Sequence, residues 1–200
     1  VNGLIDRDQV MRKGGLQPGD KIILTKPVGT GTLFAADMRH KAKGRWITAA
    51  LDSMVQSNRL GAECLLRHDT HACTDVTGFG LLGHLVEMVR ASDVDVELDL
   101  SAIPFLDGAE DTVRDGIVSS LQPQNVRLRR AIANLDEAGD DPRYPLIFDP
   151  QTSGGLLATL PAENAEACIA ELKSLGYTRT AIIGDVLPKS DRLEPVTIKL

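Results

Sequence analysis

Short apolar runs of strand length alternate along the chain with segments whose apolar residues recur at helical spacing. Such strands and helices are stable only when their apolar faces are packed against another layer, so this alternation restricts the fold strongly. The runs predicted as strands are 21–26, 72–76, 94–100, 144–149, 154–160, 180–187 and 195–200. The segments predicted as helices follow the glycines at 29–31, start at Trp46, surround Cys64, cover 80–91 and follow Pro161. The pattern predicts an α/β or α+β fold, a layered sandwich of helices on a mixed β-sheet.

Three stretches carry finer predictions. Residues 94–100 alternate strictly between apolar and acidic, which places the three acids on a face that meets water. Residues 105–143 contain SSLQPQN and most of AGDDPRYP at 138–145, and both stretches are typical of loops. Residues 1–20 are polar and glycine-rich and end in the turn signal GGLQPGD. They are interpreted as a lead-in that adds little core, and 21–200 as the domain.

Composition excludes several classes of partner. The formal net charge is -6 and the pI is near 5.2, so there is no electrostatic attraction to nucleic acid or to anionic lipid. Hydrophobic residues make up 42% of the chain, which is enough for a core. No apolar run has the length of a membrane span, and the first residues do not resemble a signal peptide. We therefore expect a cytoplasmic protein that binds neither nucleic acid nor membrane.

The chain has three cysteines, Cys64, Cys73 and Cys168, with no CxxC pair. Their odd number and wide spacing argue against a disulfide framework and against a thiolate zinc site. Each is interpreted as a small buried apolar residue. His71 and His84 flank a glycine turn without a ligand spacing around them, so polar edge or core roles are favoured over metal binding.

The stretch HACTDVTGFGLLGHL, residues 71–85, holds one acid between a strand and a helix. Asp75 would lie at the carboxyl end of the strand, where open sheets bind ligands. Gly78 and Gly80 permit a close backbone approach, and the amides at the start of the helix favour an anion such as phosphate. A carboxylate beside phosphate is typical of a Mg²⁺ site. In the alternative interpretation Asp75 or Thr77 caps the helix and the glycines only form a tight turn.

A second glycine-rich loop lies in DPQTSGGLL, residues 149–157. Thr152, Ser153, Gly154 and Gly155 offer hydroxyls and bare amides that could line an anion site. The alternative is an ordinary hairpin or bulge. Dinucleotide, Walker and nucleophile-elbow patterns are absent: the GTG at 29–31 lacks the third glycine of GxGxxG, and the sequence contains neither GxxxxGK[ST] nor GxSxG.

Taken together, the strings ILTKPVGTG at 23–31, AALDSMVQSN at 49–58, ACTDVTGFGLLGHL at 72–85 and DPQTSGGLL at 149–157 resemble the selenophosphate synthetase (selenide, water dikinase) family. The resemblance implies the C-terminal domain of that enzyme, with the fold of the aminoimidazole ribonucleotide synthetase superfamily. It implies an enzyme that uses ATP, selenide and water to make selenophosphate, AMP and phosphate. It assigns Asp75 as a Mg²⁺ ligand, and it suggests Thr77, Gly78, Thr152, Ser153, Gly154 and Gly155 as residues facing the phosphates of ATP.

The family's reactive cysteine or selenocysteine, its lysine and its other metal aspartates belong to an N-terminal domain that would precede Val1. We therefore expect this chain to be a C-terminal part with no catalytic residue of its own. It would be inactive alone, would need the missing N-terminal domain, and would belong to a homodimer when intact. Two alternatives remain: another enzyme of the superfamily, of the thiamine-monophosphate kinase or aminoimidazole ribonucleotide synthetase type, or a non-catalytic binding or assembly module.

Overall fold

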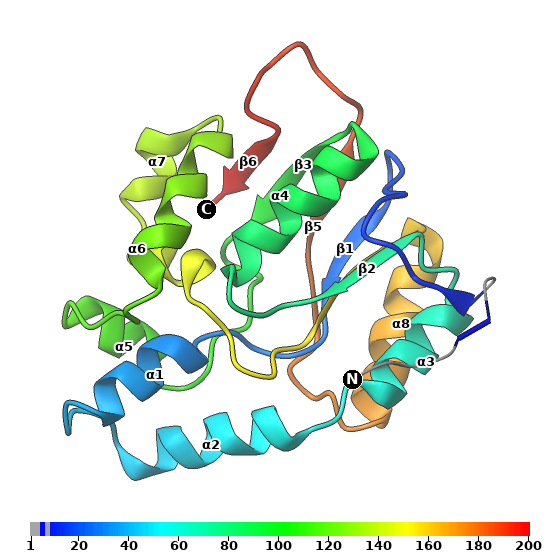
Figure 1. The fold of residues 1–200 in the computed structure, drawn as a ribbon. Coiled ribbons are helices and arrows are strands. Elements are labelled where there is room, and N and C mark those ends of the chain that lie inside the picture. The colour runs from blue at the N-terminus through cyan, green and yellow to red at the C-terminus, as the bar shows by residue number, and fades with distance from the viewer. Residues whose placement is uncertain (1–4, 7–8) are drawn as a thin grey trace.

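The computed structural model describes residues 5–6 and 9–200, and six strands in this part of the chain form one sheet (Figure 1). The strand order is β2-β4-β1-β5-β3-β6. The neighbours are antiparallel except β3 and β6, which are parallel, so the predicted mixed sheet is confirmed. The strands are β1 Lys21–Leu24, β2 Ala72–Asp75, β3 Asp95–Asp99, β4 Leu156–Leu160, β5 Ala181–Leu187 and β6 Val196–Lys199.

Helices fill the connections between the strands. The α-helices are α1 Thr30–Asp37, α2 Gly44–Val55, α3 Arg59–Arg67, α4 Gly80–Ser92, α5 Ala109–Arg114, α6 Gln122–Asn125, α7 Leu135–Gly139 and α8 Ala162–Ser174. Two 3-10 helices cover Val126–Ala131 and Tyr144–Phe148. The helices predicted from apolar periodicity are confirmed. The stretch SSLQPQN, predicted as a loop, instead ends in α6.

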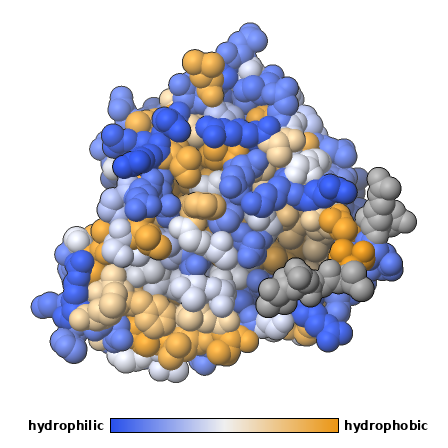
Figure 2. All heavy atoms as spheres, in the orientation of Figure 1, coloured by the Kyte–Doolittle hydropathy of each residue, from blue (hydrophilic) through white to orange (hydrophobic). Residues whose placement is uncertain are grey.

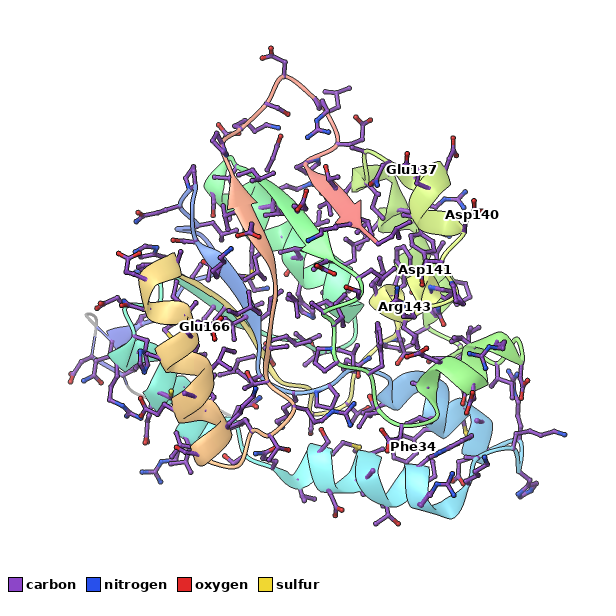
Figure 3. All side chains as sticks on the ribbon, turned by 180° about the vertical axis from the view of Figure 1, so that it is seen from behind. Phe34, Glu137, Asp140, Asp141, Arg143 and Glu166 are labelled. Atoms are coloured by element: carbon purple, nitrogen blue, oxygen red, sulfur yellow. The ribbon has the colours of Figure 1, made fainter. Side chains whose placement is uncertain are left out.

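Alternate residues of the central strand β1 enter two different cores. Ile22 and Leu24 pack with the apolar face of α4, whereas Ile23 packs with residues of α3 and α8. Successive side chains of a strand point to opposite faces, so a strand buried on both faces must be apolar at every position. Figure 1 shows α4 over one face of the sheet, and the reverse view in Figure 3 shows α8, which carries the labelled Glu166, on the other. The predicted layered sandwich is confirmed.

The prediction of a strand at 144–149 is wrong. Tyr144–Phe148 is a 3-10 helix in which Leu146, Ile147 and Phe148 are buried against the main core. Pro145 stands near its start, where the missing N–H costs no helical hydrogen bond. A short apolar run has the same composition in a buried strand and in a buried helical turn, so periodicity could not separate the two.

The expected water-facing acids of β3 also need correction. Asp95 is only 1% exposed and accepts hydrogen bonds from Lys189 Nζ at 2.8 Å and from the backbone N–H of Ser190 at 3.1 Å. Glu97 and Asp99 are half-buried. The connection between β5 and β6 brings Lys189 and Ser190 to Asp95, and alternation within β3 carries no information about that segment.

The apolar face of α2 is only partly covered. Trp46 and Ala50 are buried, but Leu51 is 45% exposed and Val55 is 81% exposed. Figure 2 shows apolar side chains gathered along the lower edge of the molecule, where α2 lies in Figure 1. The helical spacing of this segment was therefore predicted correctly, but only the first half of the stripe is packed within the described residues.

Part of the predicted lead-in contributes to the domain. Residues 1–4 and 7–8 lie outside the described residues. Leu16 is 4% exposed and belongs to the main core, and the carbonyl oxygen of Arg12 accepts a hydrogen bond from the N–H of Cys73 at 2.8 Å. The described part of the segment before β1 therefore packs along β2 and contributes Leu16 to the main core.

Candidate functional site

The pairing of β2 with β4 places the two predicted glycine-rich loops side by side. Asp75, the last residue of β2, lies opposite Leu156, the first residue of β4. One residue further along, the N–H of Val76 donates to the carbonyl oxygen of Gly155 at 2.9 Å. The register of this strand pair therefore joins segments that are remote in sequence.

An open cleft of about 390 Å³ lies where these segments meet. Asp75, Thr77, Ser153 and Gly154 line one part of it, and the end of α2 with the residues that follow lines the rest. The lining residues from that second part are Met54, Val55, Gln56, Ser57 and Asn58, with Lys26 between the two parts. Asp75 is the single acid among the lining residues.

The Asp75 side chain is exposed, and no hydrogen bond between described residues involves its carboxylate. Helix α4 has Phe79 as its N-cap residue and no side-chain cap. The alternative in which Asp75 or Thr77 caps the helix is therefore wrong. The tight turn of that alternative is present at Gly80, which has φ 73° and where a Cβ would lie 2.8 Å from the backbone carbon of Phe148, but Gly78 has no such constraint.

Thr77 is held by His84 of α4. The N–H of Thr77 donates to His84 Nε2 at 3.0 Å, so that this nitrogen acts as an acceptor. His84 is 3% exposed, and burial lowers its pKa, which favours the neutral ring that the hydrogen bond needs. The backbone N–H of Thr77 is therefore already used in a hydrogen bond within the protein. The Thr77 hydroxyl, whose oxygen lies 3.2 Å from His84 Nε2, is the polar group that this residue offers to the cleft.

Lys26 forms the base of the cleft. It is 2% exposed, and its ammonium donates to the carbonyl oxygens of Ser53 at 3.1 Å, Gln56 at 2.5 Å and Ser153 at 3.2 Å. Burial lowers its pKa, while two of its acceptors belong to the C-terminal end of α2, where a cation is favourable. Lys26 thus ties α2 to the loop of Ser153, whose φ of 48° lies in the left-handed region.

The paired glycines allow the second loop to pack closely. A Cβ on Gly154 would lie 2.1 Å from the carbonyl oxygen of Val76, and one on Gly155 would lie 2.6 Å from the backbone nitrogen of Lys26. Gly155 does not line the cleft, and the carbonyl oxygen of Gly154 accepts from Asn58 Nδ2 at 2.9 Å. The glycines are therefore required for backbone approach between protein segments.

The start of the same loop caps α1. Gln151 Oε1 accepts from the N–H groups of Gly29 at 2.9 Å and Thr30 at 3.2 Å, and Asp149 Oδ2 accepts from Gly31 at 2.9 Å. Asp149 is fully buried, which raises its pKa to about 7, and its Oδ1 has no hydrogen-bond partner in the described part of the chain. The sequence reasoning missed both caps, although an acid and an amide on either side of Pro150 were the available signal.

The predicted phosphate-facing residues thus do not form one surface. Asp75, Thr77, Ser153 and Gly154 share the cleft described above, whereas Gly78 and Thr152 line a neighbouring cavity of about 330 Å³ beside α1. Gly155 is buried between strands and loop. The structure therefore brings four of the seven predicted site residues together.

The predicted structural roles of two nearby residues agree with their surroundings. His71 Nδ1 lies 2.9 Å from the buried carboxylate of Asp20, outside the cleft. Cys73 is buried in β2, and burial, with a smaller contribution from the charge of Asp75, raises the pKa of its thiol to about 12. A thiol with such a pKa is not a nucleophile at neutral pH.

Residues 17–194 match the family described as AIR synthase related protein, C-terminal domain. The chain belongs to this family. In this AIR synthase related domain the match covers β1 to β5 and ends just before β6.

Curated relatives of the domain carry the name selenide, water dikinase. One from Trichlorobacter lovleyi is 40% identical over 193 residues, which cover 96% of this chain and 55% of the relative. The resemblance found in the sequence is therefore confirmed. The chain spans about half the length of the curated relatives that it matches, 54% in the case of a Geobacter metallireducens protein that is 39% identical.

A solved structure shares the fold of the domain. Hydrogenase maturation protein HypE in complex with ATP has a TM-score of 0.66 at 23% identity, covering 97% of this chain and 51% of that one. At such identity the likeness concerns the fold alone.

No helix in residues 5–6 and 9–200 is both long and apolar enough to span a membrane.

The residues of the cleft fit one part of a Mg²⁺ site. Mg²⁺ takes oxygen ligands and is commonly held by one or two carboxylates together with substrate phosphates. The Asp75 carboxylate is exposed to the cleft and has no hydrogen-bond partner among residues 5–6 and 9–200, so it is available as such a ligand. The remaining oxygens would have to come from hydroxyls, from the substrate or from residues outside the described part of the chain.

Proposed function

We propose that this AIR synthase related domain is the C-terminal part of an ATP-dependent selenophosphate synthetase, which converts ATP, selenide and water to selenophosphate, AMP and phosphate. The observation that carries the proposal is the free Asp75 carboxylate at the open end of β2, beside the hydroxyl-bearing loop at Ser153. Relatives named selenide, water dikinase supply the reaction.

Each group of the cleft has a task in this proposal. Asp75 would hold Mg²⁺, and the ion would supply positive charge to offset the negative charge on phosphate oxygens during phosphoryl transfer. Thr77 and Ser153 offer hydroxyls to phosphate oxygens. Lys26 keeps the Ser153 loop in position, since its ammonium is already engaged by three carbonyl oxygens.

The residues that line the cleft do not include the further metal ligands or the nucleophile that this reaction needs. Among its lining residues there is one carboxylate and no cysteine. Phosphoryl transfer depends on positioning and on charge stabilisation by several groups, which Asp75 cannot supply alone. We therefore include in the proposal that a further region of the intact protein, the expected N-terminal domain, contributes the other ligands and the nucleophile, and that the isolated chain is inactive.

The central experiment replaces Asp75 in the intact protein. Asp75→Asn keeps the size of the side chain and removes its charge. We expect selenide-dependent AMP formation to fall by about 100-fold or more, as when one charge-stabilising group is lost from an active site, and the Mg²⁺ concentration for half-maximal rate to rise. Asp191→Asn is the matched control, because Asp191 is exposed in the connection between β5 and β6, away from the β2 edge.

Equal activity and equal Mg²⁺ dependence in Asp75→Asn and Asp191→Asn would remove Asp75 from the site. The isolated chain provides a second test. Selenide-dependent AMP formation by these 200 residues alone would contradict the proposed need for another region, without touching the role of Asp75.

One alternative is an enzyme of the same fold with a different acceptor. A thiamine-monophosphate kinase from Stenotrophomonas maltophilia shares the fold at 18% identity, with a TM-score of 0.62 over 97% of this chain and 54% of that one. Presenting the intact protein with ATP and either selenide or thiamine monophosphate separates the two, because only one acceptor should accelerate nucleotide consumption.

A second alternative is a binding module without chemistry. The internal roles of Gly80, Gly154 and Gly155 favour it, because their lack of side chains is explained by packing. Calorimetric titration with Mg-ATP, with and without a separately produced N-terminal half, distinguishes these cases. The proposal expects binding that strengthens when the half is added. A homodimer stays a prediction of the family resemblance, and a cytoplasmic location stays a prediction from the sequence.

A further inference from the structure

Three residues with metal-binding side chains meet between α3 and α8, in the layer of the fold that packs against the outer face of β1 and β4. Cys64 and His68 lie one helical turn apart on α3, and Cys168 lies on α8. One ligand atom from each residue, the two sulfurs and an imidazole nitrogen, lies within 4.8 Å of the other two. Residues four apart project from the same face of a helix, which explains the first pair.

The cluster is enclosed but accessible. Cys64 and Cys168 are fully buried, whereas the His68 side chain is 17% exposed and connects the cluster to the surface. The thiol of Cys64 lies 4.0 Å from the carbonyl oxygen of Cys168, a weak contact, and it is also near the carboxylate of Glu171. Two free thiols and an imidazole therefore face one another without strong hydrogen bonds between them.

A carboxylate orients the histidine. Glu171 lies one turn after Cys168 on α8, and its Oε2 is 2.7 Å from His68 Nε2. Its Oε1 accepts from Arg67 Nε at 3.1 Å, which keeps Glu171 in place. Histidines that bind metals commonly give their second ring nitrogen to a carboxylate, and this partner sets the ring orientation and raises its basicity.

We propose that Cys64, His68 and Cys168 bind a thiophilic divalent cation, best matched by Zn²⁺, with Glu171 as the residue that positions His68. Cysteine and histidine ligands select Zn²⁺ over Mg²⁺ or Ca²⁺, which prefer oxygen. Three protein ligands leave the fourth tetrahedral position to water, on the side of His68 that reaches solvent. This site is distinct from the Asp75 cleft, and its bound ion would clamp α3 to α8.

Binding must displace protons. Burial raises the pKa of the Cys64 thiol, and it raises that of Cys168 to about 12. Because only thiolates bind Zn²⁺, the ion has to release thiol protons as it enters. Glu171 and Arg67 are the charged side chains nearest to the thiols, and they remain paired with each other.

The test is a titration of the reduced, metal-free chain with Co²⁺, a coloured probe of zinc sites. We expect saturation at one Co²⁺ per chain, with a sulfur-to-cobalt charge-transfer band that Zn²⁺ abolishes. Cys168→Ser should lose the band. Cys73→Ser is the matched control, since Cys73 is a buried cysteine of β2 outside the cluster, and it should keep the band. Far-ultraviolet circular dichroism establishes that each variant is folded.

Glu171 is partly exposed, so a substitution there leaves the packing of the core unchanged. Glu171→Gln should lower the affinity for Zn²⁺ by about 10–100-fold, as loss of a metal-orienting carboxylate does elsewhere. Absence of a charge-transfer band in the folded parent chain would overturn the proposal. So would a band that survives in folded Cys168→Ser, or a Cys64–Cys168 disulfide in the oxidised chain with no Co²⁺ binding after reduction.

Discussion

The N–H of Thr77 donates a hydrogen bond to His84 Nε2 across the turn that joins β2 to α4, over 3.0 Å. This contact links the candidate cleft to a buried, neutral ring. It exists only while Nε2 is unprotonated, so the turn beside Asp75 is sensitive to acid.

His84 should make the domain lose stability in mild acid. Its folded pKa is below the ordinary value of about 6.5 because of burial, so the unfolded chain binds a proton first. The stabilising contribution is complete above about pH 6.5 and is lost as the pH falls through the folded value. His84→Gln keeps an acceptor but does not titrate. As the pH falls from 7 to 5, the unfolding free energy measured with urea should decrease less in this variant than in the parent. An equal dependence of unfolding free energy on pH in both proteins would contradict a role for His84.

Asp149 should have the opposite effect. Burial raises its folded pKa to about 7, above the ordinary value of about 3.9, so the folded state binds the proton more tightly. The contribution of its protonation to the stability of the domain is complete below the pKa of Asp149 in the unfolded chain. This contribution is lost as the pH rises through about 7. In Asp149→Asn the amide oxygen can still accept from Gly31, where Oδ2 accepts now.

The measurement for Asp149 is the difference in unfolding free energy between variant and parent across the pH range. We expect this difference to shift in favour of Asp149→Asn as the pH rises through the titration of Asp149. A difference that does not vary with pH would show that Asp149 stays charged in the folded domain.

Lys26 should be needed for the stability of the cleft. Lys26→Met keeps the apolar stem and leaves three carbonyl oxygens without their shared donor. We expect a loss of about 2–4 kcal/mol in urea unfolding, with faster hydrogen exchange in the Ser153 loop. Lys173→Met, at an exposed position of α8, is the control and should change stability by less than about 0.5 kcal/mol. Comparable effects of the two substitutions would disprove the bracing role.

Two glycines of the predicted site should respond differently to the same substitution. Gly154→Ala would bring a Cβ to 2.1 Å from the carbonyl oxygen of Val76, so the loop must move, at a cost of about 1–3 kcal/mol. Apart from its chain neighbours, no described residue has an atom within 4 Å of a Cβ on Gly78, and Gly78→Ala should stay within about 0.5 kcal/mol of the parent. Thermal or urea unfolding measures both, and a silent Gly154→Ala would refute the close approach.

Local sequence was sufficient for most elements of the fold. The apolar run of β1 and the stripe of α4 are explained by the periods of strand and helix, and these periods do not depend on the rest of the chain. The same reasoning placed Asp75 at the carboxyl end of β2, where the structure has it. It failed at Tyr144–Phe148, because a short buried run lacks a distinguishing period.

Only the tertiary structure decided which of these residues meet. The pairing of Asp75 with Leu156, the burial of Asp95 under Lys189, and the meeting of Cys64 with Cys168 each join segments far apart along the chain. The cysteine spacing argued against a zinc site because zinc motifs are recognised from cysteines and histidines that lie close together in the sequence. Periodicity determines which face of an element is apolar, whereas the partner of that face is selected by packing and strand register across the whole domain, and no single segment encodes it.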